Sequence, residues 1–195
     1  MTTTTAATRK TEILRRAAEI FCAKGFHATS MSEIADSVEL TKAGLYYHVD
    51  GKEDLLFSIV SYGMDRLESW IERARVLEDA QERLRSVIHD HAAGITSDGT
   101  SITLLVDAVD ALSPDHRRRI RDRQRAYVGF IQSTLCELRR EGRLIDVDPS
   151  VAAFALLGSV MWIARWYRRD GRLSGEQIAD EITALGLSSI LKKEK

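Results

Sequence analysis

The stretch TKAGLYYHVDGKEDLL, residues 41–56, gathers aromatic, cationic and hydrogen-bonding side chains on a segment too short to form a core of its own. Thr41 can cap a helix, because its side-chain oxygen can accept a hydrogen bond from a backbone N–H group of the first turn. This helix is predicted to end near Val49, since Asp50 and Gly51 are typical of a turn before the next helix.

Few side chains of this segment are suited to a hydrophobic core. Leu45 and Val49 are apolar and four residues apart, so they share one helix face. The flat, cationic and hydrogen-bonding side chains must then face outward, and these are Lys42, Tyr46, Tyr47 and His48. A small exposed surface of this composition predicts a binding partner.

The composition bounds the class of protein. A chain of 195 residues with 44% hydrophobic content can bury a core in one large domain or two small ones. The 28 basic and 29 acidic residues nearly cancel, so attraction to nucleic acid must come from local clustering. Cys22 and Cys136 lack the spacing of a metal site or disulfide framework, and the N-terminus lacks a signal peptide, which favours a cytoplasmic protein.

The N-terminal part predicts a helix-turn-helix unit. Apolar residues repeat at intervals of three and four over 9–24, and Gly25 ends this helix. Ser30 followed by Glu33 forms a capping box for a short helix over 31–37. A tight turn then leads into the quoted helix, which gives the plan whose second short helix enters the major groove of DNA.

The rest of the chain also predicts helices. Periodic apolar residues and capping signals place them at 52–76, 79–95, 102–112, 114–142, 149–170 and 174–191. Two prolines and few alternating β-branched stretches argue against a sheet, so the predicted fold class is all-α. The longest apolar run, 151–163, is shorter than the ~18 residues of a spanning helix, which predicts no membrane partner.

These patterns divide the chain into three regions. Residues 1–8 are polar and predict a disordered tail, and residues 9–51 predict a three-helix DNA-binding domain. Residues 52–195 predict a helical bundle for ligand binding and dimerisation, with the boundary at Gly51.

Two motifs resemble the TetR/AcrR family of bacterial transcriptional regulators in their order and spacing. They are TSMSEIA at 29–35, and LYYHV at 45–49 followed by GKEDLL. The resemblance covers residues 9–60 and implies a DNA-binding domain of the helix-turn-helix type. Glu39 departs from the family pattern, because it stands in the turn where glycine is common; this costs backbone strain and places a negative charge near the expected DNA.

The resemblance also implies which residues contact DNA. It assigns phosphate contacts to Thr41, Lys42, Tyr46 and Lys52. It assigns base-edge contacts to Ala43, Gly44, Tyr47 and His48, with Ser32 of the preceding helix beside them.

The segment SVMWIARWYRRDGRLSGEQIADEI, residues 159–182, resembles the acyl-CoA-sensing branch of the same family. Met161 departs from that branch, in which a polar asparagine is expected at this place. The alternative interpretation is that Trp162, Trp166 and Tyr167 are packing residues at helical spacing.

Arginines between 117 and 125 give a second ligand signal. Arg118, Arg121 and Arg125 share one helix face, where they either pair with the phosphates of a CoA group or form an ordinary solvated face. The predicted ligand site comprises Met64, Arg118, Arg121, Arg125, Trp162, Arg165 and Trp166. His89 and His91 are two residues apart and point to different sides of a helix, so no metal site is predicted.

The run 151–163 is apolar on nearly every side, and such a helix must be covered all round. A second copy of the chain can cover the face that its own domain leaves open, which predicts a homodimer. The predicted interface comprises Phe154, Leu157, Gly158, Met161, Ile182 and Leu185. Two-fold symmetry would place two recognition helices ~34 Å or a multiple apart and require a palindromic operator in double-stranded DNA.

The sequence therefore predicts a homodimeric DNA-binding repressor that a small apolar effector, such as an acyl-CoA, releases from its operator. No cofactor is predicted, and no nucleophile with its base, metal cluster or phosphate loop indicates an enzyme. The alternative is a helical adaptor or ligand-binding protein, or an all-helical enzyme, without DNA-binding activity.

Overall fold

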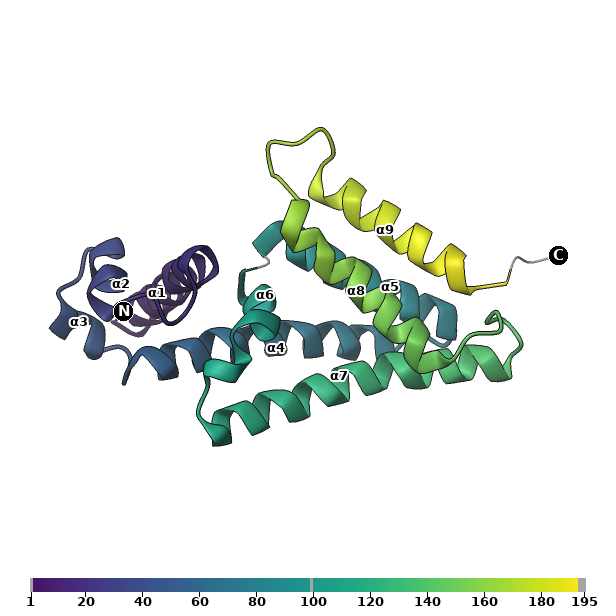
Figure 1. Cartoon of the computed structure of the whole chain (residues 1–195), viewed down its shortest axis with the longest axis horizontal. Helices are drawn as coiled ribbons and strands as arrows, with labels where there is room; N and C mark the ends of the chain where they lie inside the picture. Colours follow the sequence, from purple (N-terminus) through teal and green to yellow (C-terminus); the bar gives the residue numbers. More distant parts are fainter. Residues whose placement is uncertain (1, 99, 193–195) are drawn as a thin grey trace. The chain divides into compact units, whose positions relative to one another are not determined.

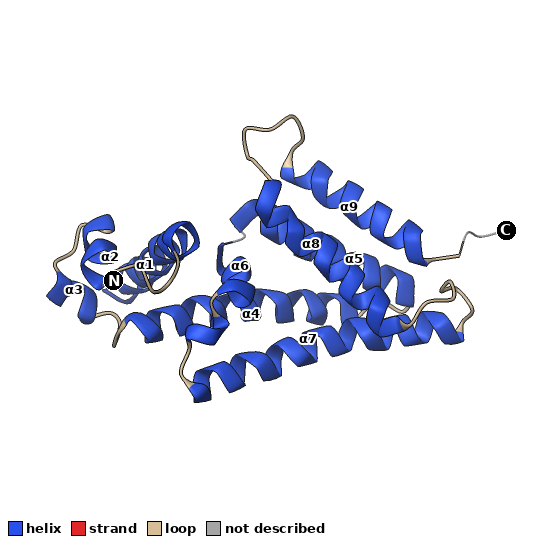
Figure 2. Cartoon of the chain, viewed as in Figure 1, coloured by secondary structure: helices blue, strands red, loops and turns tan. Residues whose placement is uncertain are grey.

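The computed structural model describes residues 2–98 and 100–192, and these are almost entirely helical (Figure 2). The helices are α1 (Thr2–Lys24), α2 (Met31–Ser37), α3 (Lys42–Tyr46), α4 (Lys52–Arg75), α5 (Ala80–Asp98), α6 (Thr100–Asp107), α7 (Pro114–Arg140), α8 (Pro149–Trp166) and α9 (Gly175–Ile190), with a 3-10 turn η1 (Val109–Ala111) before α7 (Figure 1). The predicted all-α fold class is confirmed.

The chain folds as two compact units. Within the described residues, unit 1 comprises 2–64 with 100–121, and unit 2 comprises 65–98 with 122–192. Gly51 separates α3 from α4 as predicted, but the first half of α4 belongs to unit 1, so the compact division does not fall at Gly51. The reason is that Leu55 and Ile59 of α4 are buried, which makes this half of the helix part of the core of unit 1.

Unit 1 holds the helix-turn-helix on one apolar core. α1 packs against α2 and α6, and α2 packs against α3. The largest side chains buried in this unit are Ile13, Phe21, Ile34, Leu45, Leu55, Leu56, Ile59, Met64, Ile102 and Leu104.

Local capping signals fix the helix ends of unit 1. Thr41 Oγ1 accepts a hydrogen bond from the Gly44 N–H at 3.0 Å, which confirms the predicted cap of α3. Ser30 Oγ accepts from the Glu33 N–H at 3.1 Å, although the Glu33 carboxylate pairs with Lys24 and does not complete the capping box. Gly25 ends α1 with a left-handed φ of +84°, as predicted.

Two helix boundaries in unit 1 differ from the sequence prediction. α1 begins at Thr2, so the backbone of residues 2–8 is helical where a disordered tail was expected. Once a helix is nucleated, each added residue costs little, and Ala6 and Ala7 are the best helix formers. α3 ends at Tyr46 and not near Val49, because the His48 N–H donates to the Leu45 carbonyl at 2.9 Å and closes a tighter turn.

Unit 2 is a bundle in which α5 packs against both α8 and α9 (Figure 1). Gly94 of α5 permits a close approach to α4, since a Cβ atom there would lie 2.3 Å from the indole ring of Trp70. α8 ends at Trp166 and not at Asp170, because the next residue, Tyr167, has an extended backbone with ψ 135°. The predicted caps of this unit are confirmed at Asp148 for α8 and at Ser174 for α9.

α8 is long and apolar enough to span a membrane by length and composition alone. The sequence argument missed this, because it counted the run 151–163 and not the whole helix. In the structure α8 packs against α5 and α9 and buries Ala153, Leu156 and Val160. One of its faces therefore belongs to the core of unit 2.

An ion pair holds the start of α5 to the segment after α7. Asp79 Oδ1 accepts from the N–H groups of Gln81 and Glu82 at 2.9 and 3.0 Å, which caps α5. Arg143 Nη1 donates to Asp79 Oδ2 at 2.5 Å. The Arg143 guanidinium and the backbone donors lower the pKa of Asp79 to about 2.

We expect Asp79→Asn to preserve the helix cap and remove the ion pair. Because the folded-state pKa is depressed, the contribution of this carboxylate is present above its unfolded pKa of about 3.9 and is lost as pH falls toward 2. Asp79 is 40% exposed, so screening limits the expected loss at pH 7 to about 1 kcal/mol. Urea unfolding at pH 7 and pH 3 measures the difference in free energy of unfolding between wild type and Asp79→Asn. A difference of the same size at both pH values would contradict this assignment.

Candidate functional site

α3 and the turn after it form an exposed surface, here called the reading surface, composed of Thr41, Lys42, Ala43, Gly44, Tyr46, Tyr47 and His48. Leu45 is fully buried and Val49 is 3% exposed, so these two side chains anchor the segment from below. Tyr47 is 88% exposed, more than any other large hydrophobic or aromatic side chain in the part of the chain that the structure describes. The anchoring turns Lys42, Tyr46 and Tyr47 outward as predicted, whereas His48 is half-buried.

The reading surface has a defined shape at its C-terminal end. The rings of Tyr47 and His48 meet edge to face, with centroids 5.3 Å apart. Ser32 of α2 is exposed, as expected of a residue that would lie beside DNA. Hydroxyl, imidazole and ammonium groups on such a surface can donate to phosphates and to base edges.

Lys52 lies at the start of α4 and is held within unit 1. Its Nζ atom donates to the His27 carbonyl at 3.3 Å and lies 4.5 Å from the centre of the Phe26 ring. These contacts fix the ammonium group at the end of α1 and orient it. The sequence prediction of a phosphate contact for Lys52 stays a prediction.

Glu39 in the turn between α2 and α3 has a φ of 55°. It is the one non-glycine residue with positive φ in the part of the chain that the structure describes. The strain expected from the sequence is therefore present, and it costs roughly 1–2 kcal/mol. The Glu39 side chain is exposed, so its negative charge faces solvent close to the start of α3.

A second exposed surface, the α8/α9 face, is apolar. Phe154 and Trp162 of α8 are 61% and 65% exposed, and Leu185 of α9 is 66% exposed. Of the other predicted interface residues, Gly158 is exposed and Met161 and Ile182 are half-buried. Leu157 is buried inside unit 2 and does not lie on this face, because α8 turns that side toward its own bundle. An exposed apolar face of this kind marks an interaction site.

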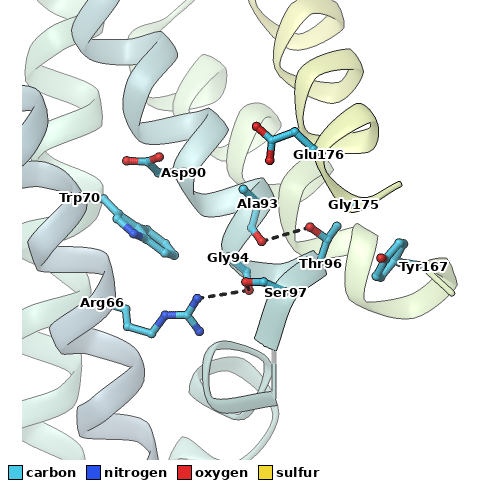
Figure 3. A pocket seen from close by; sticks show the side chains of 10 residues that line it. All are labelled: Arg66, Trp70, Asp90, Ala93, Gly94, Thr96, Ser97, Tyr167, Gly175 and Glu176. Atoms are coloured by element: carbon cyan, nitrogen blue, oxygen red, sulfur yellow. Dashed lines mark hydrogen bonds between the residues drawn. The ribbon is translucent and has the colours of Figure 1, made fainter. Parts of the chain in front are cut away.

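Unit 2 contains a cavity of about 460 Å³ (Figure 3). Its lining residues come from α4, α5, the segment after α8 and the start of α9, and they are Arg66, Trp70, Asp90, Ala93, Gly94, Thr96, Ser97, Tyr167, Gly175 and Glu176. The Arg66 guanidinium donates to the Gly94 carbonyl at 3.4 Å and lies 5.5 Å from the Trp70 ring. The cavity therefore offers a cation, an aromatic wall and hydroxyl groups.

A buried polar pair lies next to Trp70. The Tyr127 hydroxyl and His91 Nδ1 are 3.0 Å apart, and the centres of the Trp70 and His91 rings are 5.8 Å apart. Burial lowers the pKa of His91 to about 3, so its ring is neutral at pH 7, and burial also raises the pKa of Tyr127. His91 Nε2 has no hydrogen-bond partner in the protein. A buried ring nitrogen in this state can still bind a polar group of a ligand or a water.

The predicted ligand residues are not gathered at this cavity. Arg118 and Arg121 are exposed and pair with Asp115 at 2.7 Å and Asp110 at 2.6 Å. Arg125 pairs in the same way with Asp122, while Trp162, Arg165 and Trp166 are exposed on α8 and Met64 is fully buried. None of these seven residues lines the 460 Å³ cavity, so the predicted ligand site stays a prediction.

Sequence reasoning missed the residues that do line it. Arg66, Trp70 and Tyr167 come from segments separated by up to a hundred residues, and no motif joins them. His91 was correctly expected to point away from His89, because it pairs with Tyr127 while His89 faces α9. The sequence signal for this region was His91 among apolar residues, and the sequence does not indicate which residue pairs with it.

Comparison with known proteins assigns the two parts of the chain to one family. Residues 13–59 match the family of bacterial regulatory proteins of the tetR type, and residues 77–190 match a tetracyclin repressor-like C-terminal domain. The chain is 26% identical to the transcriptional repressor KstR2 of Mycobacterium tuberculosis, over 95% of this chain and 94% of that protein.

Solved structures agree. AibR, solved in complex with isovaleryl coenzyme A and operator DNA, is 38% identical, with 91% of this chain and 97% of that chain covered and a TM-score of 0.81. A TetR/AcrR regulator from Thermobifida fusca is also 38% identical, with 92% and 97% covered and a TM-score of 0.69. These matches favour neither an adaptor nor an enzyme. The chain belongs to the TetR family of DNA-binding transcriptional regulators.

Proposed function

We propose that the chain is a homodimeric repressor that binds a palindromic operator and leaves it when an acyl-CoA binds. The observation that carries this proposal is the reading surface, which a buried Leu45 and a Thr41 cap hold outward. AibR, which is 38% identical, was solved with both isovaleryl coenzyme A and operator DNA, and this supports the same pair of ligands here. Action on an operator would place the protein in the cytoplasm.

The reading surface would lie in the major groove. Lys42 and the Thr41 hydroxyl would bind phosphates at the groove edge, where they fix the position of α3. Tyr47 is the most exposed of these aromatic side chains, and it and the half-buried His48 beside it would donate to or accept from base edges. Glu39 faces solvent near the start of α3, where its negative charge would weaken binding to nearby DNA phosphates.

The α8/α9 face would form the dimer interface. Phe154, Trp162 and Leu185 are each more than 60% exposed, and burying an apolar side chain of this size contributes about 1.5–3 kcal/mol. A two-fold axis through this face would present two copies of the reading surface. A palindromic operator is the DNA sequence that matches two such copies.

The effector would bind in unit 2. The 460 Å³ cavity is within the size range of ligand pockets, and Arg66 can pair with a phosphate or thioester oxygen of an acyl-CoA. The neutral His91 ring, with its unpaired Nε2, lies behind the Trp70 wall. Binding would favour a conformation whose two reading surfaces no longer match the groove spacing, which is a shift of population between two states.

Replacing the reading side chains is expected to weaken operator binding without unfolding the protein. Tyr47→Ala and His48→Ala each remove a base contact, and each should raise the operator Kd about 5- to 150-fold, because such contacts are worth about 1–3 kcal/mol. Fluorescence anisotropy on an operator selected from genomic fragments measures Kd. Tyr62→Ala on α4, which removes an exposed tyrosine outside the reading surface, is the matched control and should bind as wild type. Wild-type affinity of both reading-surface variants would overturn the assigned surface.

Placing a charge on the α8/α9 face is expected to break the dimer. Leu185→Glu puts a carboxylate where the proposed interface excludes water, so the dimer should dissociate at micromolar protein in sedimentation experiments. Val76→Glu, at a residue that is 80% exposed just after α4, should leave the dimer intact. A monomeric wild type, or a Leu185→Glu variant that stays dimeric, rules out this interface.

Acyl-CoA is expected to release the operator, whereas free CoA is not. Isovaleryl-CoA and a long-chain acyl-CoA should each lower the anisotropy of labelled operator, because the acyl group carries the apolar part of the binding energy. Arg66→Gln should reduce the response if the effector uses the cavity, and Arg118→Gln should reduce it if the effector uses the arginine face. A complex indifferent to every acyl-CoA would remove the proposed effector class.

A further inference from the structure

Three metal-ligating side chains meet between α5 and α9. His89 lies on α5, and Glu176 and Asp180 lie one helical turn apart on α9. His89 Nε2 is 3.2 Å from Asp180 Oδ1 and 3.6 Å from Glu176 Oε1. The ligand atoms of all three side chains lie within 4.8 Å of one another. A spacing of four residues on α9 turns both carboxylates toward the same histidine.

The two separations from His89 Nε2 fit a tetrahedral metal site. Zn²⁺ binds imidazole nitrogen and carboxylate oxygen at about 2.0–2.2 Å, so two ligands of a tetrahedral site lie about 3.4 Å apart. The two distances from His89 Nε2, 3.2 and 3.6 Å, lie on either side of this value. One imidazole and two carboxylates suit a divalent transition ion better than Mg²⁺ or Ca²⁺, which prefer oxygen alone.

A second observation points to a bound group at the same place. His89, Asp180 and Thr183 line one cavity of about 400 Å³ in unit 2. Thr183 is 1% exposed, and its hydroxyl oxygen has no hydrogen-bond partner in the protein. It follows Asp180 by three residues on the same face of α9, so the hydroxyl lies one turn from the Asp180 carboxylate, whereas Glu176 lies one turn further toward the start of the helix. A buried hydroxyl without a partner needs one, and a water molecule on a metal ion is a suitable partner.

The other charged side chains near the three ligands are paired or cancel one another. Asp90 lines the same cavity but is held by Arg73, whose guanidinium donates to it at 2.6 Å. Glu82 and Arg85 of α5 also line the cavity, and because one is acidic and the other basic, their effects on a bound cation largely cancel. The net field on a cation at His89 is therefore set mainly by the Glu176 and Asp180 carboxylates.

We propose that His89, Glu176 and Asp180 bind a divalent transition-metal ion of the Zn²⁺ type, with a water as the fourth ligand and Thr183 as the partner of that water. The ion joins the first two turns of α9 to α5. It binds the folded chain and not the unfolded one, so it stabilises unit 2. None of the three ligands belongs to the reading surface, whereas Glu176 also lines the 460 Å³ cavity.

Metal binding by the full chain tests the proposal directly. Protein stripped with EDTA is titrated with ZnCl₂ in a calorimeter, and CoCl₂ is added to a second sample for its visible absorption. We expect one ion per chain, an absorption typical of four-coordinate Co²⁺, and a rise in Tm with ZnCl₂ that MgCl₂ does not produce. No binding, or binding with octahedral Co²⁺ absorption, would overturn the proposal.

Ligand variants locate the ion. His89→Gln and Asp180→Asn each remove one of three protein ligands and should weaken Zn²⁺ binding more than about 100-fold, since outer partners alone cost 10–100-fold. Asp180 is 68% exposed, so its variant keeps the fold if His89→Gln does not. Glu181→Gln, at the exposed neighbour of Asp180, is the matched control and should bind Zn²⁺ as wild type. Wild-type affinity in Asp180→Asn would place the ion elsewhere and refute the site.

Thr183→Val separates metal binding from packing. The change keeps the shape of the side chain and removes only the hydroxyl, so Zn²⁺ affinity should fall about tenfold through loss of the water's partner. The metal-free protein should be at least as stable as wild type, because a buried hydroxyl without a partner is destabilising. A loss of stability without metal, together with unchanged Zn²⁺ affinity, contradicts the role given to Thr183.

Discussion

The burial of Leu45 is the contact on which the DNA-reading surface depends. α3 has five residues, and a helix this short is unstable alone because nucleation costs more than one turn returns. Leu45 is fully buried, Val49 is 3% exposed, and the Thr41 hydroxyl supplies the first missing hydrogen bond. Because these three residues hold the helix in place, its other side chains are not needed for folding and can contact a partner. This explains why tyrosine, histidine and lysine side chains gather on so short a helix.

Features encoded within about one helical turn of sequence were predictable. The caps at Thr41, Asp148 and Ser174 follow from a polar side chain placed two or three residues before the N–H that it binds. The strained backbone at Glu39 was expected from the family resemblance, in which glycine is common at this place in the turn. Helix ends were less predictable: α3 and α8 stop at an aromatic residue whose apolar pattern would allow the helix to continue. Periodicity shows that a residue can lie in a helix, but not that the backbone there remains helical.

Contacts between distant helices could not be predicted in the same way. The periodicity of α5 shows that His89 and His91 point apart, yet nothing in the sequence pairs His91 with Tyr127 or His89 with Asp180. The arginines of α7 are a further case: the sequence predicted that they share one helix face, but it did not predict which carboxylates they pair with. A helix pattern specifies a direction for each side chain, whereas the partner depends on packing angles that one chain without homologues does not reveal.

α9 links three features of unit 2 because each of its faces has a different task. Ile178 and Leu187 are buried against the bundle, whereas Leu185 points out from the α8/α9 face. Glu176 and Asp180 turn toward α5. A helix that packs this way moves as one body, so a group that fixes its first turns on α5 also restricts the position of Leu185. If the proposed ion binds at His89 and the proposed interface forms on the α8/α9 face, the two events would be coupled through one helix, and by thermodynamic reciprocity each would change the affinity of the other by the same factor.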